Sequence, residues 1–375
     1  ILLASNPDMA DNTFAFFKYL LENRRGVYRY TWVLQEPKKV EQYKKMILEN
    51  IDINGGDLED INFVGKKTIR GLLAYIKSKY VFTSNGTFNQ ILFPKTQIVV
   101  SLWHGMPLKS IGCWPKMGDP SNAVKCPQYL YAIATSRLYQ KVVAEAFSLP
   151  EKQVLVTGQP RCDLVYYNKG CFSKMGIERS KYSKILRWAP TFRSRQDVKD
   201  ITDGIYNNSF PVVDLKRLAE VNHHLANLDS FLIIKIHTLD ILNIKKYGDY
   251  SNILIIRNAD LLNIGCQFIS LLREVDILLT DYSSVYIDYL LFNRPIVFLT
   301  DDFDAYNDNR GFVFDDALNY MPGEMVNDYD GLIRTLHKVI VKGEDAFADE
   351  RQRVCELMHE VTNNFSQNLA DRLEM

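Results

Sequence analysis

Residues 277–292, ILLTDYSSVYIDYLLF, form a strand, a tight turn and a helix in direct succession. The first four residues are apolar or β-branched and predict a buried strand that ends at Thr280. Residues 283–292 are predicted to form a helix that follows the turn. A strand that turns directly into a helix is typical of the βαβ units that build a parallel sheet.

The same alternation extends outward from this stretch. Before residue 168 the predicted strands are 30–34, 80–83, 97–102, 131–135 and 153–157, and the predicted helices are 13–23, 40–49, 69–79 and 137–147. After the polar residues 168–183, strands are predicted at 184–188, 231–236, 253–256, 277–280 and 296–299, and helices at 213–227, 283–292 and 329–341. The pattern predicts an α/β fold of two Rossmann-like doubly wound domains, residues 1–170 and 171–375, with the final helix free to pack back on the first domain.

Composition excludes several classes of protein. A chain of 375 residues exceeds the size of about 250–300 residues at which single cores stop growing, which favours two domains. Lys plus Arg and Asp plus Glu number 45 each, so no overall field draws the chain to nucleic acid or to an anionic bilayer, and no nucleic-acid partner is expected. No apolar run approaches the roughly 18–20 residues of a membrane span. The chain begins at Ile1 without an initiator Met, so we expect an upstream segment.

The spacing of the cysteines and glycines indicates which metals, disulfides or cofactors to expect. The six cysteines have neither the short paired spacing of a zinc site nor the density of a disulfide scaffold, which predicts reduced thiols in a cytosolic protein. The first strand-to-helix turns lack Gly-x-Gly-x-x-Gly, which argues against a nicotinamide or flavin dehydrogenase. No pair of carboxylates compels a metal. We therefore expect neither a cofactor nor a bound metal.

Two histidines follow predicted strands, at the edge of the sheet where open α/β proteins bind their ligands. His104 lies in the loop WHGMPLK, where an imidazole can take a proton near neutral pH or serve as an ordinary structural histidine. Lys109 of the same loop can meet an anion or remain solvated. His237 shares one side of its strand with Lys235, which suits a phosphate as well as the polar end of a buried strand.

Six more residues could contact an anion: Asp281, Ser283, Ser284, Arg193, Arg310 and Gly311. The serine hydroxyls and the free backbone N–H groups at the start of a helix form either an anion site or an ordinary N-cap. The arginine forks fit phosphoryl oxygens, although they could equally pair with nearby Asp residues as a structural clamp. The glycine permits a close backbone approach to a ligand.

Eight segments resemble, in their order and spacing, the CDP-glycerol glycerophosphotransferases that build teichoic-acid-like and capsule polymers of bacterial cell envelopes. They are residues 11–20 (DNTFAFFKYL), 103–112 (WHGMPLKSIG), 157–163 (TGQPRCD), 188–193 (WAPTFR), 235–237 (KIH), 281–295 (DYSSVYIDYLLFNRP), 310–315 (RGFVFD) and 321–323 (MPG). The resemblance implies a GT-B-like pair of domains facing across a cleft. Residues 1–170 would then lie on the acceptor side and residues 171–375 would hold the nucleotide donor.

The resemblance further implies a transferase that moves glycerol phosphate, or a related polyol phosphate, from a CDP-alditol to a hydroxyl of a growing polymer and releases CMP. It implies that His104 and His237 are catalytic, and we assign the general base to His104. The remaining candidates would meet charge on the phosphoryl oxygens or orient the groups that do. Thr238, Cys162 and Arg294 stand where the family usually has Pro, Asn and Lys, which leaves the alditol open.

Partners and location follow from the same resemblance. The expected acceptor is a polyol-phosphate or glycan chain, lipid-linked in many relatives, so we expect a cytoplasmic enzyme in peripheral contact with the inner face of the bacterial membrane. One alternative is a GT-B glycosyltransferase or epimerase that uses a sugar nucleotide, since fold does not determine function. Another is a polymer-binding module without catalytic activity.

Overall fold

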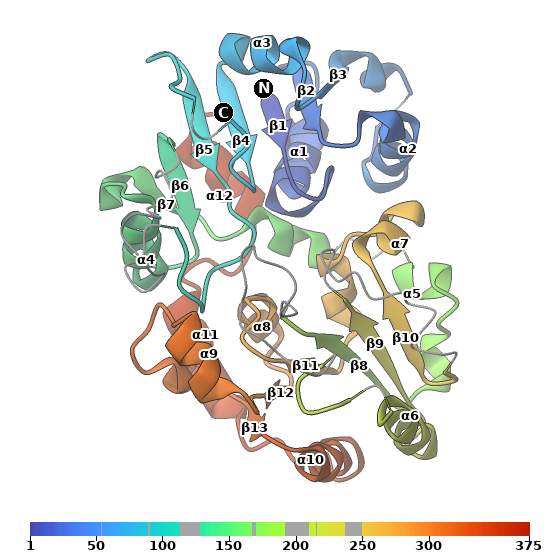
Figure 1. The fold of residues 1–375 in the computed structure, drawn as a ribbon. Helices are drawn as coiled ribbons and strands as arrows, with labels where there is room; N and C mark the ends of the chain where they lie inside the picture. Colours follow the sequence, from blue (N-terminus) through green and yellow to red (C-terminus); the bar gives the residue numbers. More distant parts are fainter. Residues whose placement is uncertain are drawn as a thin grey trace.

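The computed structural model describes residues 1–53, 55–88, 91–112, 128–166, 170–191, 210–214, 216–236 and 250–375. Two parallel sheets, each with helices on its faces, occupy the two halves of Figure 1. The N-terminal strands form one sheet and the strands after residue 183 form the other. Among the described residues, no helix is both long enough and apolar enough to cross a membrane.

The first sheet has seven parallel strands in the order β3-β2-β1-β4-β5-β6-β7. The strands are β1 (Leu2–Ala4), β2 (Tyr30–Leu34), β3 (Ile61–Gly65), β4 (Tyr80–Thr83), β5 (Ile98–Ser101), β6 (Tyr131–Ala134) and β7 (Val154–Val156). The helices between them are α1 (Asp11–Asn23), α2 (Val40–Asn50), α3 (Ile69–Lys77) and α4 (Arg137–Phe147). The strand order reverses between β1 and β4, and ligands of doubly wound sheets bind at such a reversal.

The second sheet repeats this topology with six parallel strands in the order β10-β9-β8-β11-β12-β13. The strands are β8 (Lys184–Ala189), β9 (Ser230–Lys235), β10 (Ile253–Ile256), β11 (Ile277–Thr280), β12 (Ile296–Leu299) and β13 (Glu324–Val326). The helices are α5 (Cys171–Lys174), α6 (Leu218–Asn227), α7 (Asn258–Asn263), α8 (Val285–Tyr289), α9 (Phe303–Asn309), α10 (Tyr329–Val341), α11 (Ala348–Met358) and α12 (Phe365–Arg372). The predicted α/β class with two doubly wound sheets is confirmed.

The two faces of the second sheet have different partners. Leu186 and Trp188 face the side covered by α6 and α10, where they join a core of their own. Ile185 and Ile233 face the opposite side and belong to the core that continues into the first sheet. Both faces are therefore buried, which explains why these strands are apolar runs with little alternation.

The last helix, α12, returns to the first sheet, as the red ribbon in Figure 1 shows. Its first N–H groups, those of Phe365 and Ser366, donate to the carboxylate of Asp163 at 3.1 and 2.8 Å. Gly158 has a φ of +73°, and a Cβ there would lie 2.2 Å from the Phe365 ring. Glycine is thus required at position 158 for α12 to dock.

One expectation about the cysteines is wrong. Cys171 of α5 and Cys266 form a disulfide, with Cα atoms 5.9 Å apart, although 95 residues separate them in the sequence. The pairing depends on the fold, which brings α5 beside the segment that precedes β11, and no short spacing in the sequence indicates it. Cys162 and Cys355 are free thiols, as expected.

Candidate active site

His104 lies in the loop that follows β5, close to the reversal point of the first sheet. Its Nδ1 lies 3.0 Å from the carbonyl oxygen of Ser84, the residue that follows β4. A carbonyl oxygen only accepts hydrogen bonds, so Nδ1 carries the proton in the neutral ring. The other ring nitrogen, Nε2, is left as a proton acceptor. The loop is held in an unusual backbone conformation, with φ of +50° at Trp103 and +132° at Gly105.

The surroundings of His104 favour the neutral imidazole. The side chain has solvent-exposed surface, yet the protein around it displaces water, and this desolvation lowers the pKa of His104. The cations of Arg161 and Lys109 act in the same direction, whereas the Ser84 carbonyl and the Asp11 carboxylate oppose them. A histidine with a lowered pKa is unprotonated at neutral pH and can accept a proton there.

Ser284, at the start of α8, approaches the His104 loop from the second sheet. A Cβ at Gly105 would lie 2.5 Å from Ser284 Oγ and 2.8 Å from Arg161 Nη2. The Ser284 hydroxyl makes no capping hydrogen bond to α8, so the alternative of an ordinary N-cap does not apply to it. Ser283 beside it is half-buried. The structure therefore brings together the predicted histidine loop and the predicted serine turn.

The Lys109 and Gly311 segments also meet. Lys109 and Phe312 form an isolated antiparallel bridge, Ser110 N donates to Gly311 O at 3.0 Å, and Val313 N donates to Leu108 O at 2.8 Å. Gly311, with a φ of +72°, reverses the chain after α9 and makes this pairing possible. Arg310, the residue before it, ends α9 and is half-buried.

Asp281 connects the carboxyl ends of β8 and β11. Its fully buried carboxylate accepts hydrogen bonds from the N–H of Thr191 at 3.0 Å and from the Thr191 hydroxyl. Asp281 therefore acts on the start of the loop that leads to Arg193. Arg193 itself and His237 lie outside the described residues, and their predicted roles stay predictions.

Arg161 is the residue that sequence reasoning missed. Its Nη1 donates to the carbonyl oxygen of His104 at 2.7 Å and to Asp11 at 3.1 Å, and its Nη2 donates to Asp288. Burial opposes its charge, but the carboxylates of Asp288 and Asp11 together raise the pKa of Arg161 above its ordinary value. Arg161 thus stays cationic and fixes the backbone of the histidine loop.

Asn12 supports the same loop from α1. Its side-chain amide donates to the carbonyl oxygens of Leu102 and Trp103 at 2.9 and 3.1 Å, and its Oδ1 accepts from the N–H of Arg161 at 3.0 Å. Both supporting residues lie in segments 11–20 and 157–163, which carry the family resemblance. That resemblance was the one signal in the sequence that pointed to them.

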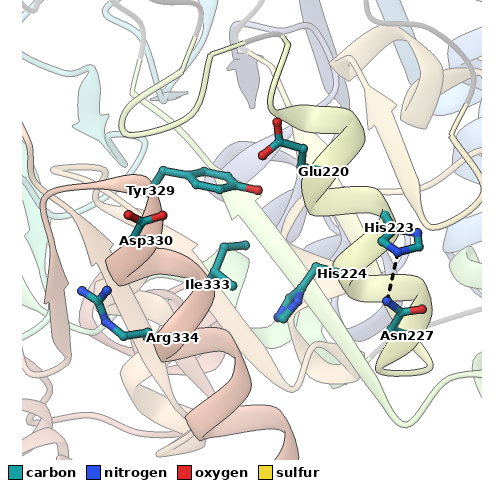
Figure 2. A pocket seen from close by; sticks show the side chains of 8 residues that line it. All are labelled: Glu220, His223, His224, Asn227, Tyr329, Asp330, Ile333 and Arg334. Carbon is teal, nitrogen blue, oxygen red and sulfur yellow. Dashed lines mark hydrogen bonds between the residues drawn. The ribbon is translucent and has the colours of Figure 1, made fainter.

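A separate hollow of about 390 Å³ lies between α6 and α10. Figure 2 shows His223 and His224 on α6 across from Tyr329 and Asp330 on α10. This hollow includes none of the predicted site residues. It lies on the face of the second sheet that has its own core, away from His104.

The comparison with protein families agrees with this geometry. The model of the CDP-Glycerol:Poly(glycerophosphate) glycerophosphotransferase family matches residues 1–374. The chain belongs to this glycerophosphotransferase family. Within the described ranges, no group of three or more His, Cys, Asp or Glu side chains is placed to hold a metal ion.

Several teichoic acid polymerases are similar to this chain in sequence. The chain is 27% identical over 342 residues to the teichoic acid poly(glycerol phosphate) polymerase of Bacillus spizizenii, covering 84% of this chain and 79% of that protein. It is 26% identical over 325 residues to the teichoic acid ribitol-phosphate polymerase TarL of Staphylococcus aureus, covering 80% of this chain and 54% of TarL. The chain therefore spans about half the length of TarL.

Solved structures support the fold. The wall teichoic acid polymerase TagF aligns over 100% of this chain and 88% of its own, with a TM-score of 0.75 and 21% identity. A UDP-GlcNAc 2-epimerase from Neisseria meningitidis aligns over 100% of this chain and 98% of its own, with a TM-score of 0.55 and 12% identity. At these identities the likeness concerns the fold alone, and the predicted GT-B-like arrangement is confirmed.

Proposed function

We propose that this glycerophosphotransferase-family chain transfers glycerol phosphate, or a related polyol phosphate, from a CDP-alditol to a hydroxyl of a growing teichoic-acid-like or capsule polymer. The observation that carries the proposal is the neutral His104, whose Nδ1 is bound to the Ser84 carbonyl and whose Nε2 is left to accept a proton. An alcohol is a weak nucleophile at neutral pH and needs such a base. The names of the similar polymerases supply the substrate class.

The proposed reaction is a single displacement at phosphorus. The acceptor oxygen attacks the β-phosphorus of the CDP-alditol while Nε2 of His104 takes the hydroxyl proton. The bond from the β-phosphorus to the bridging oxygen breaks, and CMP leaves with that oxygen and its electron pair. The Ser284 hydroxyl, which faces the histidine loop, is a candidate donor to the phosphoryl oxygens. His237, Arg193 and Arg310 keep their predicted phosphate-binding roles in this scheme.

In this scheme the two parts of the chain bind different substrates. His104 and Lys109 belong to residues 1–170, which we assign to the acceptor side. Ser283 and Ser284 belong to residues 171–375, which we assign to the nucleotide donor. The close approach of Ser284 to the His104 loop supports a reaction centre where these two parts meet.

The proposed reaction is tested by identifying the nucleotide that the protein releases. Purified protein should release CMP from CDP-glycerol or CDP-ribitol in the presence of a polyol-phosphate primer. The competing sugar-nucleotide transferase or epimerase would instead consume a UDP-sugar. Absence of CMP from both CDP-alditols across a panel of primers, with protein that is folded by circular dichroism, would contradict the proposal and favour a polymer-binding module.

The serine turn is tested by binding. We expect Ser283→Ala combined with Ser284→Ala to raise the dissociation constant for CDP-glycerol by about tenfold or more, because hydrogen bonds to charged groups contribute about 1.5–3 kcal/mol. The exposed Ser173→Ala is the matched control and should bind like the wild type. An unchanged dissociation constant in the double variant would remove the turn from the donor site.

A peripheral membrane contact is supported by an exposed apolar surface on the first sheet's side. This surface, here the α3 surface, has its large apolar side chains 36–82% exposed: Ile69, Leu72, Leu73, Ile76, Ile91 and Leu92. Five exposed cations lie on α3 or close to it and to Leu92 in the sequence: Lys67, Arg70, Lys77, Lys79 and Lys95. The sequence has no Asp or Glu between residues 61 and 97. Figure 1 places α3 at the end of the molecule farthest from the second sheet.

Anionic lipid is the partner that this chemistry fits. Apolar side chains of a surface helix enter the boundary below the headgroups, and each Lys or Arg near an anionic surface contributes about 1 kcal/mol. The zero net charge of the whole chain does not oppose this, since the cations are gathered locally. A membrane contact would place the enzyme beside a lipid-linked acceptor at the inner face of the bacterial membrane.

Vesicle binding tests the α3 surface. Ile69→Ser with Ile76→Ser should abolish sedimentation with vesicles that contain anionic phosphatidylglycerol, while turnover on a soluble primer is retained. Val341→Ser, which changes a 54% exposed residue on α10, is the control. Equal sedimentation of the double variant and the control would exclude this surface as the membrane contact.

A further inference from the structure

Among the residues that the structure describes, three arginines are largely buried, and they differ in their partners. Arg161 pairs with Asp11 and Asp288, and Arg351 pairs with Asp345 through both terminal nitrogens. Arg187, in the middle of β8, has no exposed surface and pairs with no carboxylate in the part of the chain that the structure describes. Its Nε and Nη2 have no hydrogen-bond partner there either. Arg187 is therefore the exception that needs an explanation.

A second cation lies next to Arg187. β8 and β9 run in register, with Arg187 beside Ile233 and Trp188 beside Ile234, so Lys235 emerges on the same face as Arg187. Both cations lie against one ring: the Arg187 guanidinium carbon is 3.5 Å and the Lys235 nitrogen 4.8 Å from the centroid of Phe268. Arg187 Nη1 donates to the Phe268 carbonyl at 3.0 Å. Lys235, unlike Arg187, has some exposed surface.

This pair is electrostatically incomplete. Desolvation lowers the pKa of Arg187 to about 9 and that of Lys235 to about 8, and the Arg187 charge adds to the effect on Lys235. Asp11 raises the pKa of Lys235, and Asp288 and Tyr289 raise that of Arg187, but they do not offset the burial. A fully buried cation beside a partly buried one, with no carboxylate paired to either among the described residues, destabilises a protein unless an anion joins them.

We propose that Arg187 and Lys235 form a binding site for a phosphate group, which supplies a negative charge that no carboxylate of the described residues provides by pairing with them. The phosphate enters from the exposed side of Lys235. The Arg187 guanidinium then reaches it with the two N–H groups that have no partner, Nε and Nη2. Asp11, whose field acts on Lys235, also binds Arg161 at the histidine loop, so the site adjoins the candidate active site.

The phosphate has two possible sources, and the choice between them rests on the proposed function. One is the diphosphate of the nucleotide donor, because β8 flanks the reversal point of the second sheet where donors bind in doubly wound folds. The other is a phosphate of the acceptor polymer. CDP and glycerol 3-phosphate distinguish these sources, and inorganic pyrophosphate tests the site without either.

The test combines titration calorimetry with thermal unfolding. We expect Arg187→Met and Lys235→Met each to raise the dissociation constant for inorganic pyrophosphate by about tenfold or more. Lys184→Met, at the opposite end of β8, should leave it unchanged. Without ligand, Arg187→Met should keep or raise the unfolding temperature, because it replaces an unpaired buried charge with an apolar side chain of similar length.

A purely structural role for Arg187 gives the opposite result. Arg187→Met would then lower the unfolding temperature and leave the pyrophosphate affinity unchanged, and this result would overturn the proposal. A wild-type protein that binds no pyrophosphate at millimolar concentration would overturn it as well. If the site holds, weaker binding of CDP in the variants assigns the donor, and weaker binding of glycerol 3-phosphate assigns the acceptor. CMP release by the wild-type protein is measured separately, so pyrophosphate binding without turnover would retain the site and reject the proposed reaction.

Discussion

Replacement of His104 by asparagine isolates the role of one ring nitrogen. The asparagine amide group can occupy the place of Nδ1 and donate to the Ser84 carbonyl, as the histidine does at 3.0 Å. What the variant lacks is Nε2, the atom to which we assign proton transfer. The loop conformation depends on Asn12 and Arg161, which bind its backbone, so we expect it to survive the substitution.

The expected loss follows from this single missing acceptor. General-base catalysis is worth about 10² to 10⁴ in rate, or about 2.7–5.4 kcal/mol at 1.36 kcal/mol for each factor of ten. His104→Asn should lose at least about 10² in turnover with donor and acceptor both saturating. The dissociation constant for CDP-glycerol should stay within about twofold, since the donor is held from the second sheet in our scheme.

The assay is CMP release, followed as a function of pH. Desolvation lowers the pKa of His104, and only the neutral ring can act as a base. The rate should therefore fall with decreasing pH only below the ordinary histidine range, and His104→Asn should lose this acidic limb. Turnover within about tenfold of the wild type at saturation would refute the assignment of the base, even if the family membership holds.

Three further predictions test the surrounding structure. Asp288→Asn removes a carboxylate partner from the buried Arg161 and should lower the free energy of unfolding, measured by chemical denaturation, by about 3–5 kcal/mol. An unchanged denaturation midpoint would contradict a stabilising role of this ion pair. Gly105→Ala would place a methyl group 2.5 Å from Ser284 Oγ at a φ of +132°, so CMP release and thermal stability should fall together. Gly343→Ala, at +63° with open space around it, should lose stability alone, and equal turnover of the two variants would refute a functional contact at Gly105. Burial lowers the pKa of Lys235 to about 8, so calorimetric affinity for pyrophosphate should fall as pH rises through that value, whereas Lys235→Arg should move the decline to higher pH. A flat wild-type profile would oppose the phosphate site.

Most strands of the fold could be predicted from apolar runs in the sequence, including the three-residue β7. The strands at 30–34 and 277–280 lie where the sequence predicted them, because both are apolar runs bounded by polar or turn-forming residues. β1, β3 and β13 were not predicted: β1 and β13 have only three residues each, and in β3 the polar Asn62 interrupts the apolar residues. They are strands because neighbouring strands pair with them, which is a tertiary effect.

The site was predictable only in part. His104 and Ser284 could be identified because each follows an apolar strand, and topology places such residues at the ligand-binding edge of a sheet. Arg161 could not be identified from its neighbours. Its partners Asp11 and Asp288 are 150 and 127 residues away in the sequence, and no local pattern relates them. Lys235 could be identified beside His237 as suited to a phosphate, but its neighbour Arg187 could not, since an arginine in an apolar strand gives no indication of its partners.

Arg161 links the position of the His104 loop to both sheets. Its guanidinium joins the start of α1, the histidine loop after β5 and α8 of the second sheet, through Asp11, the His104 carbonyl and Asp288. A displacement of either sheet relative to the other would break one of these bonds and leave a buried charge unpaired, which is energetically costly. The arrangement of the two sheets that places Ser284 against Gly105 is therefore also the one in which Arg161 keeps its bonds to Asp11, the His104 carbonyl and Asp288. It follows that His104, the proposed base, and the serine turn are held in register before any substrate binds, as electrostatic preorganisation requires.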